Sequence, residues 1–241
     1  HNPGGVGRNI AHNLRLMGVP VKFLTAFGND IYANELRTSC AELGMDISDA
    51  VYTELPTSTY LYITDETGEM QLAVCDTDVA DSIDETYLRS KLEVLNQAAL
   101  VIFDGNLTEG SVQFLSENVT APLFADPVSS KKAQRLRGVL PKLHTFKPND
   151  IEAMHLTETE TPEDAARALV ALGMKRVFVS CGGNGIIAAE GEQMIHLPCE
   201  KTEIVNTTGG GDASMAALAW SFTQGLSLEQ SARAALKAGA I

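Results

Sequence analysis

Short apolar runs alternate with helix-like patterns through much of the chain, and this alternation limits the fold more than any other feature. The runs at 100–103, 123–125, 143–146 and 176–180 read as strands, and a single apolar helical stripe over 88–95 precedes the first of them. Strands that are apolar throughout are typical of a parallel sheet covered by helices on both faces. We therefore predict an α/β fold, a three-layer sandwich with a mostly parallel central sheet.

Each predicted strand ends in a polar or glycine-rich corner. These corners are Asp104-Gly105-Asn106, Asp126-Pro127, Lys147-Pro148-Asn149 and Cys181-Gly182-Gly183. Parallel strands place their carboxyl ends along one edge of a sheet, and ligands bind along that edge. We therefore expect binding residues at these corners.

The first part of the chain has a different pattern. A glycine-rich start leads into a helix, a strand is predicted over 21–26, and Asp30 is placed to cap a second helix. Two alternating segments, 57–65 and 69–76, are joined by the turn-forming Glu66-Thr67-Gly68. This arrangement predicts a β-hairpin.

Composition and charge exclude several classes of protein. The 241 residues are 44% hydrophobic and 20% charged, which is ordinary for a globular protein, and a single domain over residues 1–241 fits this length. The net charge of −13 argues against binding to nucleic acid, which requires a basic surface. No apolar stretch is long enough to span a membrane.

The cysteines and the chain ends complete this picture. Cys40, Cys75, Cys181 and Cys199 form no C-x-x-C pair, and the histidines have no zinc-ligand spacing. Widely spaced cysteines suit a reducing cytosol, so we expect a cytoplasmic protein. The sequence starts at His1, already inside a motif, and stops within a helical pattern, so we expect further residues at both ends.

The run Asn206-Thr207-Thr208-Gly209-Gly210-Gly211-Asp212 carries the strongest chemical signal. Glycines expose backbone N–H groups, and the start of a helix adds unsatisfied donors and a partial positive charge, which suits a phosphate. The aspartate fits a hydroxyl that must be oriented or deprotonated while it attacks that phosphate. The alternative is a tight strand-to-helix turn. The run is not a P-loop, because no Gly-Lys-Ser/Thr follows.

Three other segments have both a functional and a structural interpretation. Gly4-Gly5-Val6-Gly7-Arg8-Asn9 lacks the last glycine of a dinucleotide fingerprint, and it either approaches a polyhydroxy ligand or caps the first helix. Asn149 and Glu152 have the form of a capping box. The segment 180–185 is either an ordinary loop or a backbone approach to the phosphates of a nucleotide.

Together these four segments, in this order, resemble the PfkB or ribokinase-type carbohydrate and nucleoside kinases. The run Val205 to Ala213 is similar to the highly specific second signature of that family, and Gly4 to Ala11 is similar to the first. The resemblance covers nearly the whole chain. It implies a ribokinase-like fold, with the hairpin at about 57–76 as a small β lid and a homodimer contact. It also implies ATP as phosphoryl donor and Mg²⁺ as cofactor.

The resemblance implies a role for individual residues. Asp212 is the expected base for the substrate hydroxyl, and the N–H groups of Gly209, Gly210 and Gly211 are the expected anion hole. Glu152 is expected to organise the hydrated Mg²⁺. The remaining predictions are Gly4, Gly5, Asn9, Tyr60 and Asn106 beside Asp212 for the acceptor, and Asn149, Ser180, Gly182, Gly185, Thr208, Gly209 and Gly211 for the nucleotide.

The chain departs from the common family run Asp-Thr-x-Gly-Ala-Gly-Asp at two positions. Asn206 replaces the first aspartate, and Gly210 replaces the alanine. The second change is expected to be mild, since only backbone donors are needed there. The aspartate often helps to hold a monovalent cation, and an uncharged amide binds potassium less strongly. Potassium activation is therefore in doubt for this chain.

Within the family, the chain most resembles the kinases that act on pseudouridine. The combination that carries this resemblance is Pro3 to Asn9, Thr67 to Met70, Asp126 to Ser129 and the variant Asn206. The expected reaction is transfer of the γ-phosphate of ATP to the 5′-hydroxyl of pseudouridine. Two alternatives stay open: another ribokinase, fructokinase or adenosine-type kinase, and a non-catalytic nucleotide- or sugar-sensing module. The expected partners are these small molecules and a second copy of the chain, without nucleic acid or membrane.

Overall fold

A six-stranded sheet runs through the middle of the molecule. The computed structural model describes residues 2–64, 70–199 and 209–239, and within them the sheet order is β10-β9-β8-β7-β6-β5. The strands are β5 (Val101–Asp104), β6 (Leu123–Asp126), β7 (Thr145–Phe146), β8 (Arg176–Ser180), β9 (Ile186–Glu190) and β10 (Gln193–Leu197). Strands β5 to β8 pair in parallel, while β9 and β10 are antiparallel. The predicted mostly parallel sheet is confirmed.

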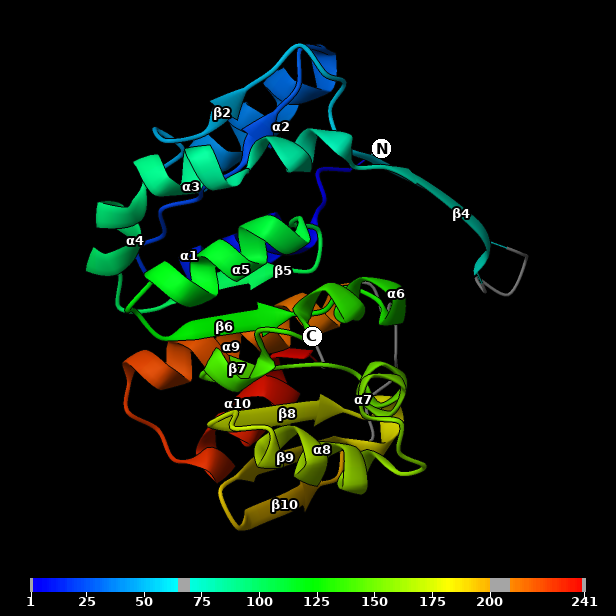
Figure 1. Cartoon of the computed structure of the whole chain (residues 1–241). Coiled ribbons are helices and arrows are strands. Elements are labelled where there is room, and N and C mark those ends of the chain that lie inside the picture. The colour runs from blue at the N-terminus through cyan, green and yellow to red at the C-terminus, as the bar shows by residue number, and fades with distance from the viewer. Residues whose placement is uncertain (1, 65–69, 200–208, 240–241) are drawn as a thin grey trace.

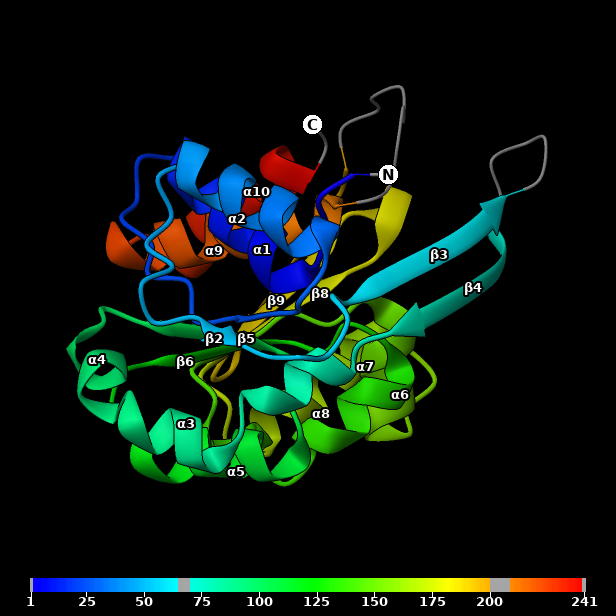
Figure 2. The same cartoon turned by 90° about the horizontal axis from the view of Figure 1, so that it is seen from above.

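Helices cover both faces of this sheet (Figure 1, Figure 2). One face carries α1 (Val6–Leu16), α9 (Gly210–Thr223) and α10 (Leu228–Gly239), and the other carries α5 (Glu109–Asn118), α6 (Ser130–Ala133), α7 (Asp150–Thr157) and α8 (Pro162–Ala171). Phe124 and Phe178 are fully buried with residues of α9 and α10, and Phe146 is fully buried in the core cluster of the opposite face. The three-layer sandwich is therefore confirmed.

A smaller layer precedes β5 in the chain and lies at the end of the molecule opposite β10 (Figure 1). Its elements are β1 (Ala26–Phe27), α2 (Ile31–Glu42), β2 (Val51–Tyr52), the 3-10 helix η1 (Asp78–Ser82), α3 (Glu85–Ser90) and α4 (Leu92–Gln97). Strands β1 and β2 pair in parallel. Three further 3-10 turns are η2 (Gln134–Leu136), η3 (Leu140–Lys142) and η4 (Gly182–Asn184).

Two predicted strands are shorter in the structure. Of the segment 21–26, only Ala26 belongs to a strand, and Lys22 forms an isolated bridge with Asp46. Of the segment 143–146, only β7 is a strand. Apolar composition predicts a buried, extended chain, whereas a strand also requires a continuous ladder of backbone hydrogen bonds. The sequence pattern does not specify that ladder.

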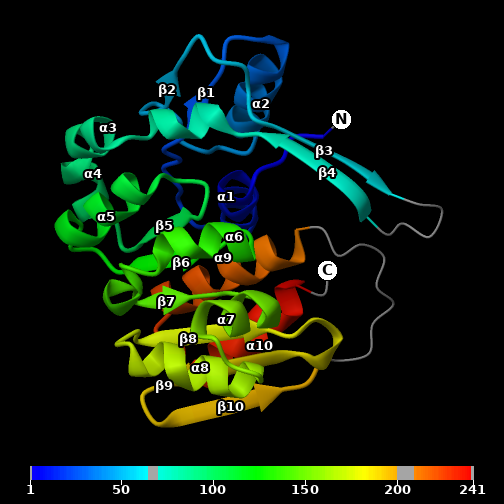
Figure 3. The ribbon, with the colours of Figure 1, turned by 45° about the vertical axis from the view of Figure 1, so that its right-hand side comes forward.

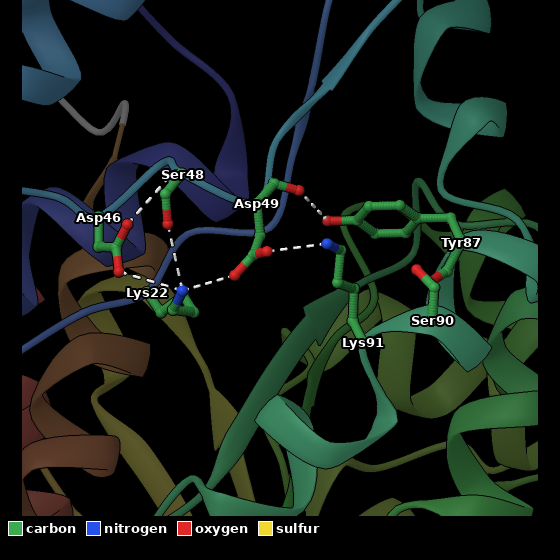
Figure 4. Close-up of polar contacts among 7 residues, drawn as sticks. All are labelled: Lys22, Asp46, Ser48, Asp49, Tyr87, Ser90 and Lys91. Atoms are coloured by element: carbon green, nitrogen blue, oxygen red, sulfur yellow. Dashed lines mark hydrogen bonds and ion pairs between the residues drawn. The ribbon is translucent and has the colours of Figure 1, made fainter.

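The single helix predicted over 88–95 is broken into α3 and α4 at Lys91. The Lys91 Nζ lies 2.8 Å from Oδ1 of Asp49, and the Tyr87 hydroxyl donates to the Asp49 carbonyl oxygen at 2.7 Å (Figure 4). Lys22 Nζ lies 2.5 Å from the other carboxylate oxygen of Asp49. Asp49 thus connects the junction of α3 and α4 to the loop before β2 through a hydrogen bond and an ion pair. The apolar stripe continues across the junction, which explains the prediction of one helix.

The predicted hairpin is confirmed as β3 (Thr59–Thr64) and β4 (Met70–Asp76), which pair antiparallel. It extends away from the body of the molecule (Figure 3). Its predicted turn, Glu66-Thr67-Gly68, lies outside the described residues. A second hairpin, β9 and β10, was not predicted, and it adds two antiparallel strands to the sheet edge. None of the helices in the described ranges is long and apolar enough to cross a lipid bilayer.

Candidate active site

The glycine run at 209–211 forms the start of α9. Gly209 is the residue before the first turn and has φ +89°, which favours glycine. Among the residues that the structure describes, no side chain caps this helix, and the N–H groups at a helix start suit an anion. A Cβ on Gly210 would lie 2.8 Å from the carbonyl oxygen of Gly239, so α9 and α10 approach closely here. The predicted residues Thr208 and Asn206 lie outside the described residues.

Asp212 lies in the first turn of α9 and is held by Asn9 of α1. The Asn9 side-chain amide donates to Asp212 Oδ2 at 2.8 Å. Burial raises the pKa of Asp212 to about 6, and the carboxylates of Asp126 and Asp104 add to this rise. The Asn9 hydrogen bond and the Lys147 ammonium oppose it. The two glycine-rich segments of the sequence are therefore brought together at a carboxyl suited to exchange protons near neutral pH.

Asp104 is a site residue that the sequence analysis did not single out. It lies at the end of β5, where its Oδ2 accepts from the N–H of Gly7 at 3.1 Å. Helix α1 has no side-chain cap of its own at Gly5, so Asp104 satisfies one of its first donors from across the fold. Burial raises the pKa of Asp104. The only sequence signal was its corner position beside the predicted residue Asn106.

Asp126 and Lys147 form a second contact that was not predicted. Lys147 Nζ lies 3.1 Å from Asp126 Oδ2, and the two side chains are 5% and 9% exposed. A Cβ on Gly211 would lie 3.5 Å from that same Nζ. A buried ammonium group therefore lies beside the start of α9, where a phosphoryl group would carry negative charge. The chain has no Walker lysine, and Lys147 supplies positive charge in this position.

Asn149 and Glu152 form the capping box that their spacing predicted. Asn149 Oδ1 accepts from the Glu152 N–H at 2.7 Å, and Glu152 Oε2 accepts from the Asn149 N–H at 2.8 Å. Glu152 is buried, and burial raises its pKa. The structural interpretation is thus correct, and the roles in nucleotide and Mg²⁺ binding stay predictions. A buried carboxylate with a raised pKa gains from a nearby cation.

The loop after β8 approaches the same edge of the sheet. Ser180 pairs with Asn149 through an isolated bridge, and its hydroxyl donates to the Pro148 carbonyl oxygen at 3.4 Å. Gly185 has φ +97°, and a Cβ there would lie 1.9 Å from the carbonyl oxygen of Leu197. Gly185 is thus required by the local backbone. That requirement explains this glycine without a ligand, so its contact with a nucleotide remains a prediction.

Every predicted site residue that the structure describes lines one continuous cleft. Asn106 lies on the β5 side, where Lys132 Nζ donates to its side-chain oxygen. Tyr60 lies on β3 and is 58% exposed. Lys147, Asp104 and the remaining predicted residues line the same cleft. The structure thus gathers segments from both ends of the chain at the carboxyl edge of the sheet.

Comparisons with known proteins agree with this arrangement. The model of a family described as pfkB family carbohydrate kinase matches residues 1–241. Pseudouridine kinase of Escherichia coli (strain K12) is 36% identical over 240 residues, which cover 96% of this chain and 76% of the relative.

Solved structures show the same fold. Ribokinase from Thermotoga maritima has a TM-score of 0.90 at 22% identity, and the match covers 100% of this chain and 80% of that one. A ribokinase II from E. coli, solved in complex with ATP and Mg²⁺, has a TM-score of 0.86 at 19% identity, with 98% and 81% of the two chains covered. The predicted ribokinase-like architecture is confirmed.

Proposed function

The chain belongs to the pfkB family of carbohydrate kinases, and from this premise we propose that it transfers the γ-phosphoryl group of ATP to the 5′-hydroxyl of pseudouridine. Members of the family are phosphotransferases with an alcohol acceptor. The coarser assignment, a sugar or nucleoside kinase, follows from the family itself. The finer one is supported by the 36% identity to a pseudouridine kinase and by the sequence features that resemble kinases of that kind.

The observation that carries the mechanism is the environment of Asp212. Its pKa of about 6 leaves the carboxyl mostly ionised at neutral pH, yet basic enough to accept the proton of an attacking hydroxyl. Asn9 fixes its orientation from the neighbouring helix α1. The bond from the γ-phosphorus to the β-γ bridging oxygen breaks as the bond to the alcohol oxygen forms. The proton passes to Asp212, and ADP leaves.

Charge stabilisation comes from the start of α9. Transfer of this kind passes through a loose transition state, so positioning and electrostatics contribute more than proton abstraction. The N–H groups at Gly209 to Gly211 face the place where charge develops in this proposal, and Lys147 lies beside them. The nucleotide would extend from there toward Asn149 and the loop after β8.

The residues present fit a hydrated Mg²⁺. Mg²⁺ keeps several waters and is held by one or two carboxylates together with substrate phosphates. Glu152 and Asp126 are the buried carboxylates at this edge that would hold it. The ion would neutralise the charge of the phosphates.

The β3–β4 hairpin is proposed as the lid and as a homodimer contact. Leu61 and Val74 are register partners, as are Ile63 and Leu72, so these four side chains share one face of the hairpin. They are 65%, 61%, 55% and 56% exposed, respectively. An aliphatic face of this kind is typical of a surface that a partner covers. We propose that a second copy of the chain covers it.

A substrate panel tests the proposed function. The purified protein is incubated with ATP, Mg²⁺ and one acceptor at a time: pseudouridine, uridine, adenosine, ribose or fructose. Mass spectrometry then identifies the phosphorylated product, with and without potassium. We expect pseudouridine 5′-phosphate and an equal amount of ADP in a reducing buffer near neutral pH, which resembles the cytoplasm. A better turnover of ribose or adenosine would reassign the substrate. Thermal stabilisation by ligands without any ADP would identify a sensing module instead.

A further inference from the structure

Thr57 lies two residues before β3 and forms the root of the β3–β4 hairpin. One carboxylate connects this root to the first turn of α2 by hydrogen bonds. Asp30 is the N-cap of α2, and its Oδ1 accepts from the N–H of Ala33 at 2.9 Å. The same carboxylate accepts twice from Thr57: Oδ1 from the hydroxyl at 2.6 Å and Oδ2 from the backbone N–H at 2.8 Å. These bonds, led by that of the Thr57 hydroxyl, lower the pKa of Asp30. The carboxylate is therefore ionised at neutral pH.

The backbone crosses itself closely at the same place. A Cβ on Gly28 would lie 2.4 Å from the nitrogen of Thr57 and 2.5 Å from the carbonyl oxygen of Leu55. The N–H of Asn29 donates to that same Leu55 oxygen at 3.0 Å. Thr57 is buried, with 5% of its surface exposed. The root is thus tightly held, whereas the hairpin beyond it extends away from the body (Figure 3).

Helix α2 also contacts the helix that holds the proposed base. Near the end of α2, the Ser39 hydroxyl accepts from Arg8 Nη2 of α1 at 2.5 Å. Arg8 is buried, and its Nη1 donates to the Pro3 carbonyl oxygen at 3.4 Å. The next residue of α1 is Asn9, which holds Asp212. The N-cap of α2 therefore contacts the hairpin root at Thr57, and the last turn of α2 contacts α1, which carries Asn9 on the acceptor side of the cleft.

We infer that Asp30 and Thr57 are positioning residues, which fix the direction in which the hairpin leaves the body and thereby how well it covers the acceptor. The inference rests on the proposed function. Thr57 and Tyr60 line the same cleft as Asp212, so a hairpin that is wrongly directed would admit water to the site. Attack by an alcohol yields ADP and a phosphate ester, and attack by water yields ADP and inorganic phosphate.

The coupling between ATP cleavage and product formation tests the inference. Thr57→Val keeps the size of the side chain and the backbone bond but removes the hydroxyl bond to Asp30. Loss of a hydrogen bond to a charged group is expected to raise the ratio of inorganic phosphate to ester, and the KM for the acceptor, by about tenfold. The KM for ATP stays unchanged. Thr57→Ser retains the hydroxyl and is expected to behave as the wild type.

Thr53→Val is the matched control, because it makes the same chemical change four residues earlier. Its hydroxyl accepts only from the Leu55 N–H, at 3.1 Å, among the hydrogen bonds of the described residues. We expect Thr53→Val to keep the wild-type ratio of phosphate to ester. Equal ratios in Thr57→Val and Thr53→Val would overturn the inference, as would a Thr57→Ser protein that is uncoupled like Thr57→Val.

Hydrogen–deuterium exchange separates this inference from the proposed function. Thr57→Val is expected to raise exchange in 59–64 and 70–76 about tenfold without any substrate, while the melting temperature falls by only a few degrees. If the wild type phosphorylates no acceptor, the proposed function fails, and hydrogen–deuterium exchange alone decides whether the hydrogen bonds between Asp30 and Thr57 fix the hairpin. Unchanged exchange in Thr57→Val would overturn the inference. The double variant Asp30→Asn with Thr57→Val should have no higher ratio of inorganic phosphate to ester than Asp30→Asn alone, because the two residues act as one unit. Additive effects of the two substitutions on this ratio would contradict the inference.

Discussion

The side-chain amide of Asn9 donates to Oδ2 of Asp212 at 2.8 Å, although 203 positions separate the two residues in sequence. Asn9 lies on α1 and Asp212 on α9, and both helices pack on the same face of the sheet. The bond therefore joins the two glycine-rich helix starts directly. It gives a buried carboxyl a fixed direction while opposing the rise of its pKa.

Replacing Asp212 by asparagine should abolish most of the turnover. Asp212→Asn keeps the size of the side chain but removes the proton acceptor, so kcat is expected to fall on the order of 100-fold or more. The KM for ATP should change little. An assay of ADP release with the preferred acceptor measures both. Asp84→Asn is a matched control, because Asp84 caps α3 and lies outside the cleft lining. Near-normal kcat in Asp212→Asn would refute the assigned role.

The same variant should be more stable than the wild type at high pH. The pKa of Asp212 rises from 3.8 to about 6 in the folded protein, so folding disfavours the ionised form. The contribution of the protonated carboxyl is fully present below the unfolded pKa and is lost as pH rises through the folded one. The maximum difference is about 3 kcal/mol. In urea unfolding, the free energy of unfolding of Asp212→Asn should exceed that of the wild type by up to this amount near pH 8. Near pH 3 the two free energies should be equal. Equal stabilities at both pH values would contradict the raised pKa.

The acidic limb of the rate profile should depend on Asn9. In the wild type, kcat/KM should rise with pH as Asp212 of the free enzyme ionises, with a midpoint near 6. Asn9→Ala removes a bond that lowers this pKa, so the midpoint should move to higher pH by about one unit. Asn13→Ala is the control, because Asn13 lies one turn later on α1 and donates to the Asn9 carbonyl oxygen. A midpoint that moves equally in both variants would count against the bond.

Removing Lys147 should destabilise the fold through Asp126. Lys147→Met leaves the buried Asp126 carboxylate without its partner, and such a change costs about 3–5 kcal/mol. Urea unfolding at neutral pH measures the loss. The double variant with Asp126→Asn removes the uncompensated charge, so it should recover much of the stability. If the double variant is less stable than Lys147→Met, the buried pair is not the cause.

A charge on the aliphatic face of the hairpin should separate the proposed dimer. Leu61→Glu places a carboxylate among Ile63, Leu72 and Val74, and desolvating it at an interface is unfavourable. Sedimentation at micromolar concentration should show a dimer for the wild type and a monomer for the variant. Leu172→Glu is the control, because Leu172 follows α8 and is 50% exposed. A wild-type monomer, or a dimeric Leu61→Glu protein, would reject this interface.

The sequence predicted the layers and the glycine-rich corners because both depend on local patterns. Apolar runs, capping residues and turn residues specify strands and helix starts without reference to distant segments. The capping box at Asn149 and the hairpin at 59–76 were found on this basis. The absence of a strand over most of 21–26 and the break at Lys91 depend on partners elsewhere in the chain, and so they were not predicted.

The site was predicted in part for the same reason. Asp212 and Asn9 belong to recognisable runs, but nothing local distinguishes Asp104 or Lys147 from the other polar residues at strand ends. Their importance comes from what lies opposite: the Gly7 N–H for Asp104, and Asp126 and the start of α9 for Lys147. Only the assembled sheet edge specifies those neighbours. The potassium question at Asn206 lies outside the described residues.

The close approach of Gly210 to Gly239 changes the meaning of a glycine that looked interchangeable with alanine. A Cβ at 210 would lie 2.8 Å from the Gly239 carbonyl oxygen, and a Cβ at 239 would lie 2.5 Å from the Ser214 hydroxyl. A methyl group at 210 requires the backbone of α10 to move, and one at 239 requires at least the Ser214 hydroxyl to move. The two positions are therefore expected to covary among related sequences: where alanine occupies the first, α10 should end earlier or lie farther from α9.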